Sequence, residues 1–180
     1  MRVGRAFDDG AMVMPLPESP MLDHVDLVAL DAFRFDDGGG YPPSYRQFIR
    51  TRGWARTFGL WLIYPPVLPG FADGRSRAVN LTARFRAAFA DGHEEDYDWM
   101  ILPDGDWALS ERLEVFGWSE NGDVLLWDVG GRDAAGEFPV WESRGMNTLH
   151  RLGESLTAAL PLLSDRAATE SVEPLTPVRL

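Results

Sequence analysis

The chain has 180 residues, a length typical of one domain and sufficient for a single sizeable core. It contains no cysteine, which excludes disulfides, thiolate catalysis and cysteine-based metal centres. The formal net charge of −11 disfavours nucleic acid and anionic membranes as partners and favours basic ones, although solubility alone can account for it. No apolar run reaches the roughly 20 residues that span a bilayer, and no signal peptide is recognised, so we expect a cytoplasmic protein.

Hydrophobic periodicity and turn residues predict an ordered series of helices and strands. In chain order these are a loosely ordered arm (1–20), a short helix or a helix running into an extended segment (21–35), a helix (43–53), a buried strand (58–64), a loop (67–77), a helix (78–90), four strands (97–102, 112–118, 123–128 and 137–142), a helix (148–160) and a mobile tail (164–180).

Several boundaries of this series rest on specific residues. Pro43 suits the first turn of a helix, and Gly53 is a natural stop. Asn121-Gly122 between two apolar runs predicts a β-hairpin. Pro139 suits an edge strand because it cannot donate a ladder hydrogen bond. Asn147 is a candidate cap for the last helix, which carries a leucine stripe and is expected to end at Pro161.

Strands follow one another in the second half instead of alternating with helices. This order favours an α+β fold with an antiparallel or mixed sheet. We expect a single domain over residues 21–163, with about five or six strands flanked by helices on one side.

Three segments resemble the signatures of the SUKH superfamily, which includes fungal cell-wall-assembly regulators and many bacterial immunity proteins. The first is Tyr41 to Ile49, with a Tyr-Pro pair and an apolar pair opening a helix. The second is Phe116 to Asp128, two strands around a Gly-Asp turn. The third is Phe138 to Trp141, followed by Ser155-Leu156. The resemblance spans about residues 41–160 in the family's order. The chain departs from it at 51–54, where the family has Asn-Gly-Gly, at Leu156 in place of Phe, and in the length of its arm.

The resemblance implies a SUKH-like fold and a protein-binding role, and nothing in it implies catalysis. We interpret the signature residues as structural, with core, turn or capping roles. They are Pro42, Tyr45, Phe48, Ile49, Gly122, Asp123, Pro139, Ser155 and Leu156.

Motifs of catalysis and cofactor binding are missing from the sequence. There is no HExxH metal motif, nucleophile elbow, phosphate-binding loop or dinucleotide fingerprint. The run from His93 to Asp96 and the pair Asp104/Asp106 could in principle hold a metal or move protons, but acidic loops with such spacing arise readily among 28 acidic residues. We therefore expect no enzyme activity, no metal and no cofactor.

Acidic residues are concentrated in one segment, residues 91–106, which contains no arginine. Trp99 and Trp107 lie within or beside it, and we expect Trp118 to face the same edge. Acidic charge with aromatic anchors suits a basic protein partner; the alternative is a solvated loop whose tryptophans lie in the core. The candidate partner-binding residues are Asp91, Glu94, Glu95, Asp96, Asp98, Trp99, Asp104, Asp106, Trp107 and Trp118.

Three hypotheses follow from these observations. The first is an immunity protein, a monomer or weak dimer, that neutralises a basic toxin such as a nuclease by occluding it. The second is an intracellular scaffold or regulatory interaction module of the same fold. The third is an enzyme with an unrecognised site, which predicts a deep pocket with convergent polar groups.

Overall fold

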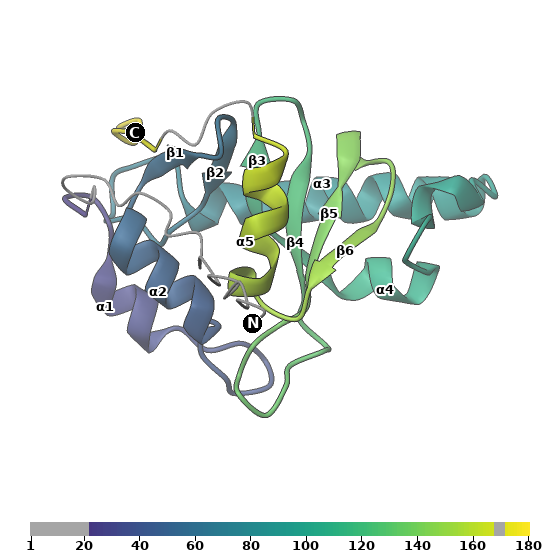
Figure 1. Cartoon of the computed structure of the whole chain (residues 1–180), viewed down its shortest axis with the longest axis horizontal. Helices are drawn as coiled ribbons and strands as arrows, with labels where there is room; N and C mark the ends of the chain where they lie inside the picture. Colours follow the sequence, from purple (N-terminus) through teal and green to yellow (C-terminus); the bar gives the residue numbers. More distant parts are fainter. Residues whose placement is uncertain (1–21, 168–171) are drawn as a thin grey trace, which may run out of the picture.

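The computed structural model describes residues 22–167 and 172–180, so the predicted arm (1–20) lies outside the described residues. Its centre is an antiparallel sheet of seven strands in the order β6-β5-β4-β3-β2-β1-β7 (Figure 1). The strands are β1 (Ala55–Thr57), β2 (Trp61–Ile63), β3 (Leu113–Ser119), β4 (Val124–Asp128), β5 (Val140–Ser143), β6 (His150–Gly153) and β7 (Glu173–Pro174). The described helices are α1 (Leu27–Ala32), α2 (Pro43–Arg52), α3 (Arg75–Glu94), α4 (Trp107–Arg112) and α5 (Leu156–Asp165), with the short 3₁₀ helices η1 (Asp98–Ile101) and η2 (Arg144–Met146). The predicted α+β class, with a single domain and an antiparallel sheet, is confirmed.

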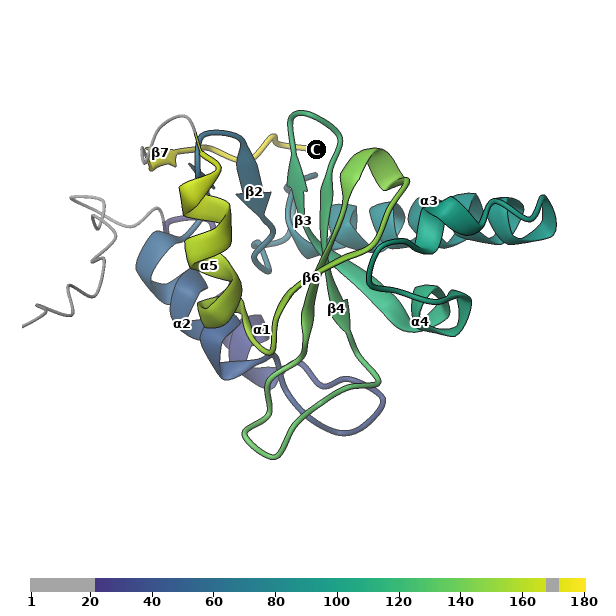
Figure 2. The same ribbon diagram turned by 45° about the vertical axis from the view of Figure 1, so that its right-hand side comes forward.

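Helices cover both faces of the sheet, so the expectation that they flank one side is wrong. Arg166 of α5 bonds to Glu142 in β5, whereas the guanidinium of Arg77 in α3 lies over the ring of Trp118 in β3. Glu142 and Trp118 pair with successive residues of β4, whose side chains point to opposite faces. Figure 2 shows α2 and α5 on one side of the sheet and α3 and α4 on the other. The physical reason is that β4 is buried along its whole length, so both of its faces need cover.

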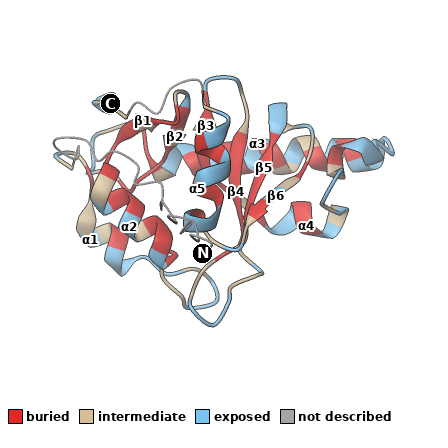
Figure 3. Cartoon of the chain, viewed as in Figure 1, coloured by how far each residue is buried: buried red, intermediate tan, exposed pale blue. Residues whose placement is uncertain are grey.

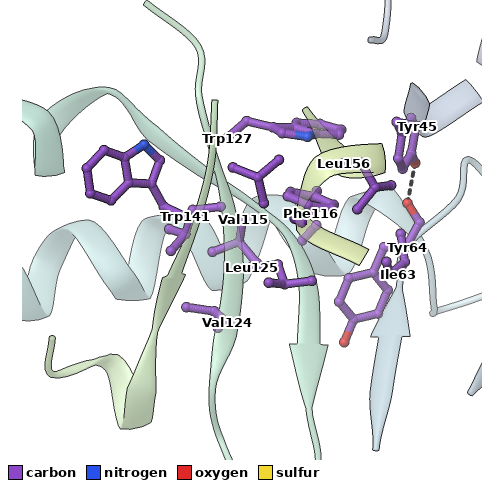
Figure 4. Packing of buried hydrophobic residues seen from close by; sticks show 14 of the residues in the cluster. Tyr45, Ile63, Tyr64, Val115, Phe116, Val124, Leu125, Trp127, Trp141 and Leu156 are labelled. Carbon is purple, nitrogen blue, oxygen red and sulfur yellow. Dashed lines mark hydrogen bonds between the residues drawn. The ribbon is translucent and has the colours of Figure 1, made fainter. Parts of the chain in front are cut away.

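The core is aromatic and centred on Trp127 of β4. This ring stacks on Phe116 at 4.4 Å between centroids and meets Tyr45 of α2 edge-on at 4.9 Å. The Tyr45 hydroxyl donates to the carbonyl of Tyr64, and burial raises the pKa of Tyr45 well above its ordinary value. Figure 3 shows this buried centre as a continuous band, and Figure 4 shows how the rings from α2, β3 and β4 meet.

The hairpin of β3 and β4 confirms the prediction from Asn121-Gly122. Gly122 has a φ of +89°, which favours glycine, and Ser119 accepts the N–H of Asp123 through its side chain. The helix predicted over 43–53 is also confirmed as α2, with Gly53 as its C-cap. The helix predicted over 78–90 is longer at both ends.

One predicted element has the wrong type, and two have the predicted type only in part. Residues 97–102 form η1 instead of a strand. The apolar run 58–64 is only partly a strand, because Phe58 and Gly59 take positive φ values in the β1–β2 turn. The segment 148–160 forms β6 and then the start of α5, so the N-cap of the last helix is Ser155 instead of Asn147, and Pro161 lies inside α5.

Pro139 does not mark an edge strand. It precedes β5, and β5 lies between β4 and β6 within the sheet. Its carbonyl accepts the N–H of Asp128, so the missing N–H at this position leaves the pairing of β5 intact.

Part of the predicted tail belongs to the domain. Residues 164 and 165 complete α5, and β7 pairs with β1. Farther on, the N–H of Val178 donates to the carboxylate of Asp73 at 2.8 Å. The C-terminal residues 172–180 therefore lie along the sheet and the loop before α3 rather than apart from them.

Candidate protein-binding surface

The acidic segment forms a projection at one end of the molecule, which we call the acidic knob and define as residues 91–107. It comprises the last turn of α3, the 3₁₀ helix η1 and the loop that enters α4. In Figure 1, α3 crosses behind the sheet and continues past it, so that the knob lies beyond the strands.

Packing explains why the chain turns back at the knob. Phe89 is the last large buried side chain of α3. One turn later, Gly92 lies against Met100 of η1, and a Cβ at Gly92 would come within 2.2 Å of the Met100 sulfur. Glycine allows this approach without a shift of Met100, so η1 packs closely against the end of α3.

The acidic side chains of the knob are all exposed to solvent. They are Asp91, Glu94, Glu95, Asp96, Asp98, Asp104 and Asp106. No arginine lies among them in the sequence. The structure therefore brings these candidate residues together on one projection of uncompensated negative charge.

Three large apolar side chains are exposed among these acidic residues. Trp99 is 49% exposed, Tyr97 44% and Leu102 54%. The rings of Tyr97 and Trp99 stack with centroids 5.7 Å apart. The alternative that Trp99 lies in the core is wrong. Sequence reasoning missed Tyr97 and Leu102, because it assigned them to a strand; their position among acidic residues was the signal that could have found them.

Trp107 is half-buried and supports the knob from within. Its ring stacks on His93 with centroids 4.6 Å apart and meets Phe89 edge-on. Its indole N–H donates to Asp98 Oδ1 at 3.1 Å. Trp107 thus joins α4, α3 and η1 and fixes the geometry of the exposed face.

Asp104 and Asp106 have structural partners as well as exposure. Asp104 Oδ2 accepts the N–H of Arg151, so it covers part of the open edge of β6. Asp106 Oδ1 accepts the N–H of Leu109 at 2.6 Å and is the N-cap of α4.

Trp118 does not belong to this surface. It lies in the middle of the sheet beside Arg77, in the first turn of α3, whereas Asp91 is near the other end of that helix. At 1.5 Å per residue the two ends are separated by roughly 20 Å. The expectation that Trp118 faces the acidic edge is therefore wrong.

The signature residues lie in the core and at element ends. Tyr45, Phe48, Ile49 and Leu156 are buried, and Ser155 caps α5 by accepting the N–H of Ala158. Pro42 precedes α2, and Asp123 Oδ1 accepts the N–H of Gly145.

A residue that the sequence did not single out connects two of the signatures. Ser44 Oγ donates to Glu137 at 2.6 Å and accepts the N–H of Leu156 at 3.2 Å. The starts of α2 and α5 are therefore tied together by one hydroxyl.

One groove among the described residues contains a buried carboxylate that is already paired. A groove of about 430 Å³ between the β1–β2 turn and α5 contains Glu142, whose carboxylate is already bound by Arg144 and Arg166. Among residues 22–167 and 172–180 no group of three acidic or histidine side chains is placed to hold a metal ion. In that same part of the chain, no helix combines the length and the apolar character that a bilayer requires. Comparisons with family models, curated proteins and solved structures gave no match to this chain.

Proposed function

We propose that this chain is a non-enzymatic, protein-binding domain that engages a basic protein through the acidic knob. The observation that carries the proposal is the pair of stacked, half-exposed rings, Tyr97 and Trp99, surrounded by exposed carboxylates. Burying large aromatic side chains supplies much of the affinity of protein interfaces. Charge of one sign around them speeds the encounter with a partner of the opposite sign.

Within this role we propose neutralisation of a cognate toxin in the cytoplasm. The resemblance of residues 41–160 to the SUKH superfamily, with its bacterial immunity proteins, supports this narrower function. Toxins that cut nucleic acid need a basic substrate groove. A rigid projection with seven carboxylates can occupy such a groove in place of phosphates, and its aromatic centre can pack against the groove wall.

Co-expression with the toxin encoded beside the gene tests this function. The expected result is a stable complex on size-exclusion chromatography and restored growth of cells that express the toxin. Binding without restored growth would favour a scaffold or regulatory module. Neither binding nor restored growth would contradict the proposal.

The substitution Trp99→Ala tests whether the acidic knob contributes to partner binding, and Val79→Ala is the matched control. Val79 is an apolar residue on α3 that lies outside the knob, and it is 60% exposed. We expect only the first substitution to weaken the complex.

A further inference from the structure

A second surface feature has the opposite charge. A pocket of about 290 Å³ lies where the loop before α2 meets the loop between β4 and β5. Both views show these two loops side by side at the same end of the molecule (Figures 1 and 2). Three arginines line the pocket, Arg34, Arg46 and Arg132, together with one carboxylate, Asp31.

The carboxylates at this pocket are already matched by arginine. Asp31 is held by Arg50, with both carboxylate oxygens 2.6 Å from one guanidinium nitrogen. Asp37 accepts from two nitrogens of Arg132, Nε and Nη2, and these hydrogen bonds lower the pKa of Asp37. Arg132 also donates to the carbonyls of Gly40 and Gly136, so it fastens the two loops together.

The remaining two arginines form no salt bridge within the described residues, although the pKa of Asp31 is lowered by its hydrogen bond to Arg50 and, to a lesser extent, by the charge of Arg46. Arg34 donates only to the backbone carbonyls of Asp31 and Phe33. Arg46 forms no ion pair there, and its Nε is buried without a hydrogen-bond partner. Native structures rarely leave a buried donor unpaired without a reason. A chain with a net charge of −11 nevertheless places two guanidiniums that form no salt bridge with the described residues at one pocket.

Gly39 allows a close approach of Arg132 at this pocket. A Cβ at Gly39 would lie 2.5 Å from the Arg132 guanidinium carbon, whereas a Cβ at Gly40 would make an ordinary contact with Arg34 Nη1 at 3.4 Å. A larger residue at position 39 would therefore require the Arg132 guanidinium to shift.

We propose that this pocket binds the phosphate group of a small molecule. Guanidinium groups match phosphate oxygens in geometry and form charge-assisted hydrogen bonds with them. Arg34 and Arg46 are the binding residues, and the buried Nε of Arg46 gains the acceptor that it lacks. Arg132 is a positioning residue, because its donors are already used to hold the loops. This site is independent of the acidic knob and of the partner proposed for it.

Isothermal titration calorimetry at constant ionic strength tests the site with inorganic phosphate, and in a second arm with glycerol 3-phosphate. We expect saturable binding of at least one of them. Arg46→Gln and Arg34→Gln should each weaken it about tenfold or more, since a hydrogen bond to a charged group contributes about 1.5–3 kcal/mol. Tighter binding of glycerol 3-phosphate would identify a phosphomonoester as the ligand, and equal or weaker binding would identify free phosphate.

The matched control is Arg84→Gln, which removes the same charge from an exposed position on α3. It should change the dissociation constant by less than about twofold, because a distant surface charge is screened by salt. Circular dichroism melts check that each variant is folded, and the exposed Arg34 provides a second test if Arg46→Gln is unstable. No saturable binding by the wild type, or equal effects of Arg34→Gln, Arg46→Gln and Arg84→Gln, would overturn the proposal.

Discussion

Trp99 and Trp107 belong to the same acidic segment but lie in different environments. Trp99 is half-exposed and stacks only on another exposed ring, whereas Trp107 packs against His93 and Phe89. The sequence alone left both in one group, because a tryptophan in a polar segment suits a core or an interface equally well. Their surroundings make Trp99 the candidate for partner contact and Trp107 the residue that supports the knob.

This difference predicts a separation of binding from stability. Trp99→Ala should leave the free energy of unfolding within about 0.5 kcal/mol of wild type, since exposed side chains contribute little. It should weaken the partner complex by about 2 kcal/mol or more, as interface aromatics do. Trp107→Ala should lower the stability itself by about 1–3 kcal/mol, because it removes a half-buried ring. Urea denaturation and partner titration measure the two quantities; equal stability losses in both variants would contradict the assignment.

Ser44 offers a second prediction at the residue scale. Ser44→Ala removes the hydroxyl that joins Glu137 to the first N–H of α5, so a buried N–H loses its acceptor. We expect a loss of about 1–3 kcal/mol in the free energy of unfolding. Ser76→Ala, at an exposed position in α3, should change it by less than about 0.5 kcal/mol in the same urea titration. A comparable loss in both variants would show that the connection does not stabilise the fold.

At the scale of elements, proline and glycine residues predicted the helix ends and turns that depend on local backbone geometry. Pro43 and Gly53 bound α2 because their backbone preferences act within one turn, and Gly122 marks the β3–β4 turn for the same reason. The expected helix over 148–160 failed because its leucine stripe, from Leu149 to Leu160, serves two different elements. Trp141 of β5 pairs with Arg151, and this non-local pairing outweighs the helical period.

The strand expected over 97–102 failed for a related reason. Its apolar residues are typical of a buried strand, but the pairing beside β6 is limited to an isolated bridge between Pro103 and Leu149. Met100 instead turns inward against Gly92 while Trp99 and Leu102 remain exposed. An alternation of buried and exposed residues in a short run does not distinguish a strand from a 3₁₀ turn.

The C-terminal residues should stabilise the sheet as an element. Removal of residues 172–180 deletes the β7–β1 pairing and the bond from Val178 to Asp73. We expect a loss of about 1–3 kcal/mol, because several backbone hydrogen bonds and the cover of β1 disappear together. Glu173→Gln keeps the backbone pairing and loses only the exposed ion pair with Arg56, so it should cost less than about 1 kcal/mol. Unchanged stability after the truncation, measured by urea denaturation, would contradict the role of β7.

At the scale of the whole molecule, charge is distributed unevenly. Seven exposed carboxylates lie on the acidic knob, which projects past the sheet on the end of α3, whereas two arginines that form no salt bridge with the described residues line a pocket beside the β4–β5 loop. The sequence indicated the acidic segment, since its residues are consecutive. It could not indicate the arginine pocket, because Arg34, Arg46 and Arg132 come together only when the two loops meet.

The central claim is that the knob guides and anchors a basic partner, and association kinetics test it most directly. One variant combines Glu94→Gln, Glu95→Gln and Asp96→Asn; asparagine suits position 96, where φ is +56°. Its control combines Asp23→Asn, Asp36→Asn and Asp165→Asn, which change the net charge equally at exposed positions elsewhere. Association and dissociation rates with the proposed basic partner are measured by biolayer interferometry at low and at physiological salt.

The knob variant should associate about tenfold or more slowly than wild type at low salt, with a smaller difference at higher salt, because screening weakens steering. The control should associate nearly as fast as wild type. Equal slowing in both variants would mean that net charge, and not the knob, guides the encounter, and a wild-type chain that does not bind at all would contradict the account.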